Sequence, residues 1–232
     1  MTGGRGTTLI ALALVGASVV AAPATAPATA PPSVRVVHDP EVAAMIAGVT
    51  QGQLKPVVAE LSGAAPAMIG GSPYRFTTRA SNSGTPIDKA EQYVYEHLQT
   101  YGLDSVAYQS FPGGGGGPPG RNIIGQIDGT TAADEIVIIG AHIDDRPKYG
   151  SAPGADDNAS GVSAVLYLAR AFADETFART IRFAFFGDEE NSPWNQTWGS
   201  KYGSGYYAAK CRAAGEDIVA MEHAFDQAQK KD

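Results

Sequence analysis

The hydrophobic positions upstream of Gly102 recur at helical spacing. In residues 41–63 the apolar side chains fall at steps of three and four, which predicts one or two amphipathic helices. A second helix is expected over residues 85–101, with Thr85 as its cap and Pro86 as its first residue, and Gly102 is expected to end it.

Downstream of Gly102 the pattern changes to that of strands alternating with helices. Residues 135–141 form a continuous, largely β-branched run, typical of a strand that is buried on both faces. Alternation of strand and helix from this run onward predicts an α/β fold with a largely parallel, mixed central sheet flanked by helices. The other expected strands are residues 105–111, 122–127, 181–186 and 217–221, and the expected helices are 162–172 and 201–214.

The N-terminus predicts export. Leu9–Ala22 is an uncharged apolar run that follows Arg5 and precedes several small-x-small sites, as in a secretory signal peptide. It is shorter than the roughly 20 residues that a membrane-spanning helix needs. An Ala-rich disordered tail and a tethering anchor are the alternatives. We expect residues 1–30 to be a signal peptide and the protein to be secreted or periplasmic, with no membrane association after cleavage.

Charge and cysteine content narrow the classes of function. The chain of 232 residues has a formal net charge of −7 and no cluster of Lys and Arg, which argues against a nucleic-acid binder. A single cysteine, Cys211, excludes both a disulfide framework and a cysteine-rich metal site. Residues 31–80 are interpreted as a linker with a helical segment, and residues 81–232 as the functional domain.

Acidic residues and one histidine gather where the predicted strands end. In an open α/β sheet, ligands bind outside the carboxyl ends of the strands, so these segments are the place to search for a site. Two of the segments directly follow the buried strands, and the third leads into the helix between them. The segments are Ala141–Asp145, Gly187–Glu190 and Pro153–Gly161.

A metal ion is the simplest explanation of this acidic cluster. Bare carboxylates at one edge would repel each other, and imidazole with carboxylate ligands suits zinc better than manganese, cobalt or iron. Asp144 can orient His142, while one of Glu189 and Glu190 can bind metal and the other can serve as a base. The alternatives are purely structural roles: a structural histidine, turn and cap residues such as Asp157, and a solvated strand end.

These motifs resemble peptidase family M28, whose secreted aminopeptidases use two co-catalytic zinc ions. The resemblance runs from about residue 75 to residue 221 and rests mainly on GAHIDD, PGADDNASG and GDEE. It implies a zinc-peptidase fold and a peptide or protein substrate. The metal ligands implied by it are His142, Asp157 and Glu190, with Asp157 bridging the two ions, although the pattern leaves the choice between Asp156 and Asp157 open.

The same resemblance implies that Glu189 is the general base and that Asp144 orients His142. Family members also have a later acidic ligand and a histidine nearer the C-terminus. Residues 217–221 resemble the start of the corresponding strand, but residues 222–232 do not continue the pattern. We therefore expect a truncated chain that lacks the C-terminal part of the sheet, binds Zn²⁺ at one site or with partial occupancy, and is marginally stable with little activity.

Later residues could in principle replace the expected ligands. Glu222, His223 and Asp226 are chemically capable of binding metal but do not match the family in register, so no role is assigned to them. Two alternative functions stay open: a glutaminyl cyclase-like acyltransferase on the same scaffold, and a non-catalytic binding protein or defective remnant.

Overall fold

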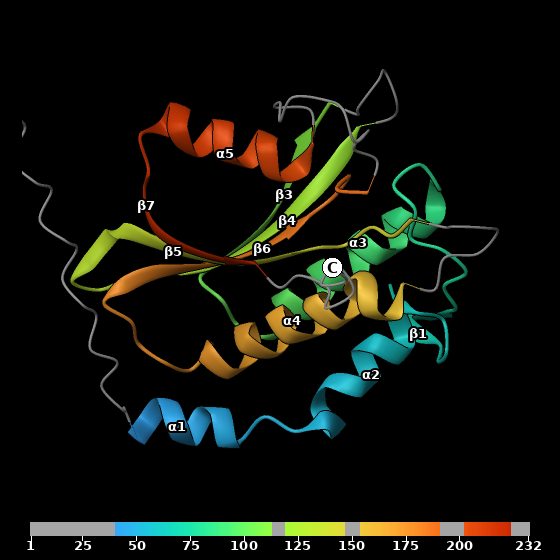
Figure 1. Cartoon of the computed structure of the whole chain (residues 1–232), viewed down its shortest axis with the longest axis horizontal. Coiled ribbons are helices and arrows are strands. Elements are labelled where there is room, and N and C mark those ends of the chain that lie inside the picture. Colours follow the sequence, from blue (N-terminus) through green and yellow to red (C-terminus); the bar gives the residue numbers. More distant parts are fainter. Residues whose placement is uncertain (1–39, 113–118, 147–153, 191–201, 224–232) are drawn as a thin grey trace, which may run out of the picture. The chain divides into compact units, whose positions relative to one another are not determined.

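A five-stranded mixed sheet organises the protein, with the strand order β3-β4-β6-β5-β7 (Figure 1). The computed structural model describes residues 40–112, 119–146, 154–190 and 202–223. The strands are β3 (Ser105–Phe111), β4 (Gly120–Ile127), β5 (Ala132–His142), β6 (Arg179–Phe186) and β7 (Asp217–His223).

Strand directions within this sheet place two carboxyl ends side by side. Strand β5 pairs in parallel with both β6 and β7, whereas β4 is antiparallel to β3 and β6. The prediction of a mixed α/β sheet is thus confirmed. In the β5–β6 register His142 lies opposite Phe186, the last residue of β6. The segments that follow these two residues therefore start at the same edge.

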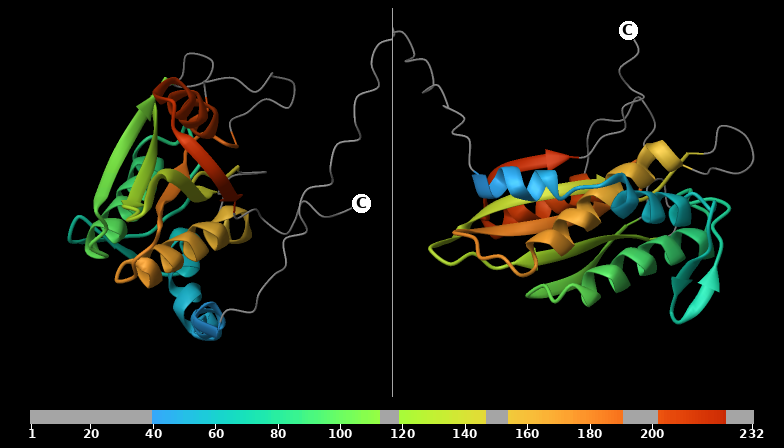
Figure 2. Two further views of the ribbon diagram at one scale, coloured as in Figure 1. Left: turned by 90° about the vertical axis from the view of Figure 1, so that its left-hand side faces the viewer. Right: turned by 90° about the horizontal axis from the view of Figure 1, so that it is seen from below.

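Helices cover both faces of the sheet. Helices α3 (Thr85–Thr100) and α4 (Gly161–Phe172) pack on one face, and α5 (Gly203–Ala214) packs on the other (Figure 2). The main hydrophobic core lies under α3 and α4, and a smaller one joins α5 to the sheet. Of the two N-terminal helices, α1 (Pro40–Ala47) and α2 (Gln51–Leu61), the second contacts α4.

The start of α3 differs from the sequence prediction. Thr85 is the first helical residue instead of the cap, and the cap position belongs to Gly84, which has φ 70° and no side chain to form a cap hydrogen bond. Glycine adopts this backbone conformation without steric cost, so the chain can turn into the helix one residue earlier. Pro86 still lies in the first turn, and Gly102, at φ 77°, follows the end of the helix as predicted.

A small hairpin that the sequence analysis did not predict precedes α3. Strands β1 (Ala67–Ile69) and β2 (Ser72–Tyr74) pair across a Gly-Gly turn. Strands of three residues are too short to show an alternating pattern. Leu61, Ala67 and Ile69 are buried in the same core as α3 and α4. The segment upstream of α3 is thus part of the packed structure.

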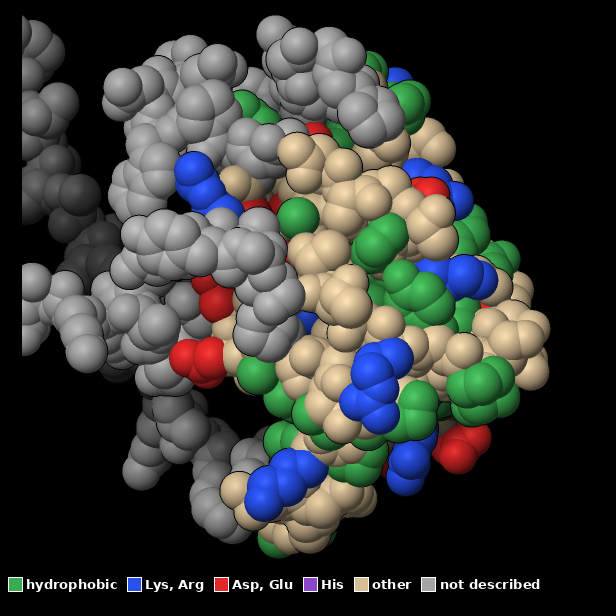
Figure 3. Space-filling view, turned by 90° about the vertical axis from the view of Figure 1, so that its right-hand side faces the viewer, with side chains coloured by type: hydrophobic (Ala, Val, Ile, Leu, Met, Phe, Trp, Pro, Cys, Tyr) green, Lys and Arg blue, Asp and Glu red, His purple; other side chains and the backbone are tan. Residues whose placement is uncertain are grey.

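The face of the protein shown in Figure 3 mixes hydrophobic, charged and other side chains. On the face shown in Figure 3, hydrophobic side chains form small separate patches between polar and charged ones. The predicted signal peptide lies outside the described residues. Among the helices of the described segments, none combines the length and the apolar character that crossing a bilayer requires.

Candidate metal centre

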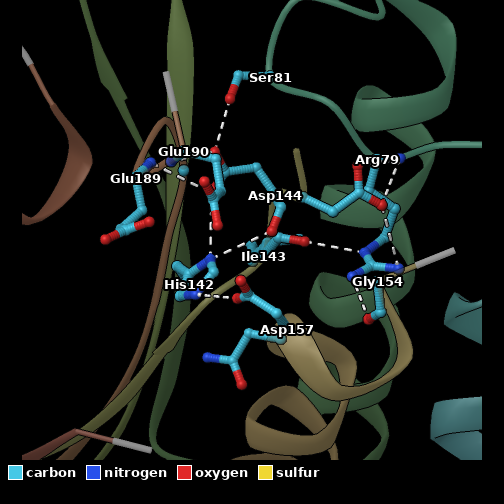
Figure 4. A network of polar contacts seen from close by, with 12 residues as sticks. Arg79, Ser81, His142, Ile143, Asp144, Gly154, Asp157, Glu189 and Glu190 are labelled. Carbon is cyan, nitrogen blue, oxygen red and sulfur yellow. Dashed lines mark hydrogen bonds and ion pairs between the residues drawn. The ribbon is translucent and has the colours of Figure 1, made fainter. Parts of the chain in front are cut away.

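His142 ends β5 and lies at the middle of a polar cluster (Figure 4). Its side chain is 7% exposed. The Nδ1 atom lies 3.1 Å from the backbone oxygen of Asp144 and 3.6 Å from its Oδ1. On the other side of the ring, Nε2 lies 3.1 Å from Oδ1 of Asp157. The imidazole is thus held through one nitrogen, and its other nitrogen faces a carboxylate.

Asp157 reaches His142 from a tight turn that precedes α4. The π-helical turn Ala155–Ser160 has non-helical backbone angles at Asp157 and Asn158, and the peptide bond between these two residues is cis. The Asp157 side chain is 38% exposed and contacts His142, whereas Asp156 beside it is exposed. The structure therefore brings Asp157, and not Asp156, to the histidine.

Asp144 connects the end of β5 to the end of β6. Its carboxylate is fully buried and accepts hydrogen bonds from the backbone N–H groups of Glu189 (3.2 Å) and Glu190 (2.9 Å). Ser81 Oγ donates a third hydrogen bond, at 2.6 Å. Asp144 is thus placed to fix both His142 and the two glutamates, and the imidazole contact to its backbone oxygen is shorter than the contact to its carboxylate.

The turn after β6 aims the two glutamates at this cluster. Asp188 adopts φ 66°, a left-handed conformation that is uncommon for residues other than glycine. Beyond it, Glu190 is half-buried and Glu189 is exposed. The half-buried position suits a ligand and the exposed one suits a group that meets substrate, as the sequence analysis predicts for Glu190 and Glu189.

Electrostatics in the cluster favour bound protons when no metal is present. Burial lowers the pKa of His142, but hydrogen bonds with Asp144 and Asp157 outweigh this effect and raise it to about 10. Burial and the nearby Asp157 carboxylate raise the pKa of Glu190 to about 8. In the metal-free protein an imidazolium therefore supplies the positive charge that the carboxylates require.

The donor set fits a divalent ion such as zinc. One ligand atom each from His142, Glu189 and Glu190 lies within 4.8 Å of the other two. Ligands of a tetrahedral zinc ion with bonds of about 2.0–2.1 Å are about 3.3 Å apart, so small side-chain movements would close this group around an ion. Asp157 already lies at that distance from His142. The geometry admits either glutamate as a ligand.

Two residues of this network belong to no sequence motif, and the sequence analysis did not predict them as site residues. Arg79 is fully buried and pairs with Asp145, and Ser81 binds Asp144. Both residues lie more than 60 positions before the acidic residues that they contact. Nothing in the pattern around residue 79 signals its position, because the contact depends on the tertiary fold.

For the candidate ligands near the C-terminus, Glu222, His223 and Asp226, the described residues show no contact with this site. Glu222 lies in β7 and its side chain is exposed. For His223 only the backbone is described, paired opposite Gly140, and Asp226 lies outside the described residues.

Comparison with known proteins agrees with the geometry. Residues 122–225 match Peptidase family M28, a region that includes all five predicted site residues. The uncharacterized protein YfbL of Escherichia coli is 30% identical over 149 residues, which are 62% of this chain and 44% of YfbL. The probable lipoprotein aminopeptidase LpqL of Mycobacterium tuberculosis is 41% identical over 71 residues, 30% of this chain and 13% of LpqL. The chain thus spans less than half of these relatives.

Solved structures support the fold. LapB from Legionella pneumophila superimposes with a TM-score of 0.64 at 24% identity, over 84% of this chain and 48% of LapB. At this level of identity the likeness concerns the architecture of the sheet and its helices.

Proposed function

We propose that this protein, whose residues 122–225 match Peptidase family M28, is a zinc-dependent aminopeptidase that hydrolyses the N-terminal peptide bond of peptides. The observation that carries the proposal is the convergence of His142, Asp157, Glu189 and Glu190 at the joint carboxyl edge of β5 and β6. Relatives named as aminopeptidases support the same class of reaction.

Three side chains are proposed to hold the zinc: His142, Asp157 and Glu190. A zinc ion held there would make water a nucleophile near neutral pH and would polarise the scissile carbonyl group. Three protein ligands with one open position are typical of catalytic zinc sites, so these residues suffice for one ion. We expect one zinc per chain, and the stoichiometry follows from elemental analysis.

Glu189 is proposed to move the proton. Its exposed carboxylate accepts a proton from the attacking water and then gives it to the nitrogen of the leaving amine as the C–N bond breaks. Meanwhile Asp144 keeps the His142 ring oriented through Nδ1 and fixes the Glu189 backbone. The proton that the water loses is thus the one that the amine product gains.

Export belongs to the same proposal. We expect residues 1–30 to be removed as a signal peptide, and N-terminal sequencing of the protein recovered from the periplasm or the medium tests this expectation.

The proposed function is tested with the full chain, added zinc and two substrates. Hydrolysis of leucine anilides supports an aminopeptidase, whereas cyclisation of peptides with N-terminal Gln indicates a glutaminyl cyclase-like enzyme. Zinc binding without either reaction would indicate a binding protein.

The proposed ligands are tested by zinc content. It is compared among His142→Ala, Asp157→Asn and Glu190→Gln, each of which should lose metal. Asp156→Asn is the matched control, because its exposed neighbouring carboxylate should not matter. Unchanged zinc in all three variants would refute the assigned ligands.

A further inference from the structure

The guanidinium of Arg79 joins three separate segments beside the candidate metal centre (Figure 4). Its Nε donates to the carbonyl oxygen of Ile143 at 3.0 Å, and Nη2 donates to that of Gly154 at 3.0 Å. Nη1 donates to the carbonyl oxygen of Leu61, the last residue of α2, at 2.7 Å. All three hydrogen-bonding nitrogens of this fully buried side chain are therefore used.

Asp145 balances the charge of Arg79 and completes the connection. Its two carboxylate oxygens accept hydrogen bonds from the Arg79 backbone N–H at 3.1 and 3.0 Å, and Oδ2 lies 3.6 Å from Nη1. In return the Asp145 N–H donates to the backbone oxygen of Arg79 at 3.2 Å. Both side chains are almost completely buried, so the pair is a permanent part of the folded structure.

Two of the three carbonyl groups bound by Arg79 belong to the segments that carry proposed ligands. Ile143 directly follows His142, and Gly154 starts the turn that presents Asp157. The guanidinium is planar and rigid, so its Nε and Nη2 hold these two carbonyl groups at a fixed separation. That separation in turn sets the distance between His142 and Asp157, whose facing atoms are 3.1 Å apart.

We propose that Arg79 is a positioning residue of the metal centre, which sets the spacing of His142 and Asp157 by binding the chain beside each of them. The inference rests on the proposed zinc site and adds to it a residue that contacts neither metal nor substrate. Asp145 follows as the counter-charge of Arg79 and not as a further ligand, because its oxygens are already occupied by the Arg79 backbone.

The Arg79→Lys substitution tests whether the hydrogen-bonding geometry of Arg79, and not only its positive charge, is required. Lysine keeps the positive charge but has a single nitrogen, so it cannot donate to the Ile143, Gly154 and Leu61 carbonyl groups in one plane. Replacing groups that orient metal ligands typically weakens metal binding by about 10–100-fold. We expect Arg79→Lys to lower zinc affinity in this range and to change the visible absorption of the cobalt-substituted protein.

Arg182→Lys is the matched control. Arg182 also forms a two-pronged interaction, with Nη1 and Nη2 donating to the Glu216 carboxylate at 2.7 and 2.9 Å. It lies within β6 and contacts Tyr207 of α5, on the sheet face opposite α3 and α4. The same chemical change there should lower thermal stability but leave zinc affinity and the cobalt spectrum unchanged.

Zinc affinity is measured by chelator competition on the full chain, at a temperature where thermal melting shows each variant to be folded. Weaker binding and an altered spectrum in Arg79→Lys alone support the proposal. Wild-type affinity and spectrum in that variant overturn it. Failure of Arg79→Lys to fold, when Arg182→Lys folds, also overturns it, because Arg79 would then act on stability in general. A wild-type chain that binds no zinc would instead refute the proposed function, and this inference with it.

Discussion

At the scale of single residues, the two nitrogens of His142 have different tasks. Asp144 contacts Nδ1 through its backbone oxygen and its carboxylate, which leaves Nε2 directed at Asp157. A histidine that binds metal commonly has its other nitrogen fixed in this way, since the fixed nitrogen determines the tautomer and the ring orientation. The same buried Asp144 carboxylate also binds the backbone of both glutamates.

Glu189→Gln tests whether Glu189 is the base and not a ligand. The amide cannot accept a proton, so turnover should fall by at least about 10²–10⁴-fold, the usual effect of removing a general base. Zinc content should stay at the wild-type value because Glu190 keeps its carboxylate. Elemental analysis and steady-state kinetics measure the two effects. Loss of zinc in Glu189→Gln, with zinc retained in Glu190→Gln, would show that the two roles are reversed.

Zinc affinity should rise with pH. In the metal-free protein the pKa of His142 is raised to about 10 and that of Glu190 to about 8, so both hold protons at pH 7. Zinc must displace about two protons, and its apparent affinity should therefore weaken as the pH falls below 8. Calorimetric titration in buffers of different ionisation enthalpy counts the released protons, and binding without proton release would contradict this prediction.

The same pKa shifts act on the stability of the metal-free protein. For both groups the folded state binds the proton more tightly than the unfolded state, whose reference values are 6.5 for His142 and 4.5 for Glu190. The stabilising charge of His142 is fully present below pH 6.5 and is lost as the pH rises through about 10. Stability without zinc should therefore decline between these values, where zinc binding becomes stronger.

At the scale of elements, local patterns were sufficient to predict most helices and strands. The β-branched run at 135–141 lies within β5, and the periodic segment 162–172 lies within α4. Each of these signals depends on residues close in sequence, where burial of one face or of both faces leaves a clear period. The motifs after β5 and β6 could be placed at one edge for the same reason, since parallel neighbours share the direction of their carboxyl ends.

Contacts between distant segments could not be predicted in this way. Arg79 lies 66 residues before Asp145, and Ser81 lies 63 residues before Asp144. Neither belongs to a periodic pattern or a motif, and their positions depend on how the segment upstream of α3 packs against the end of β5. Strand order and the three-residue strands of the β1–β2 hairpin are likewise properties of the tertiary fold.

Gly154 connects Arg79 to the turn Ala155–Ser160, which carries the proposed ligand Asp157. Its φ is 47°, and a Cβ atom there would lie 2.6 Å from Arg79 Nη2 and 2.7 Å from the Asp157 backbone oxygen. We expect Gly154→Ala to lower the free energy of unfolding by about 1–3 kcal/mol, the range typical of a strained backbone position, and to weaken zinc binding. Chemical denaturation and chelator competition measure the two effects.

Gly71→Ala is the matched control for that substitution. Gly71 also has a positive φ, 73°, but a Cβ atom there would meet nothing within 4 Å. Gly71→Ala should therefore lower the free energy of unfolding only through backbone strain and should keep wild-type zinc affinity. If Gly154→Ala is no worse than Gly71→Ala in both measurements, close packing around Gly154 does not position the ligand turn.

At the scale of the whole molecule, one edge of the described sheet is accessible and carries exposed apolar side chains. Strand β7 pairs with β5 and has no second partner strand among the described residues. Val219 and Met221 on this strand are 44% and 48% exposed. A strand edge with unpaired backbone groups and apolar side chains is a template for pairing with another chain. We therefore expect association that increases with protein concentration.

Met221→Lys should reduce this association, because a charged side chain on an edge strand opposes strand-to-strand pairing. Sedimentation velocity over a range of concentrations measures the effect, and thermal melting should show little change because Met221 is half exposed. Met68→Lys is the control: Met68 is 61% exposed but lies in the separate β1–β2 hairpin. Equal reductions in both variants would show that added charge acts on solubility in general, and no reduction in Met221→Lys would show that β7 is not the associating edge. A selective effect of Met221→Lys would place the contact at β7, the strand next to the one that ends in His142.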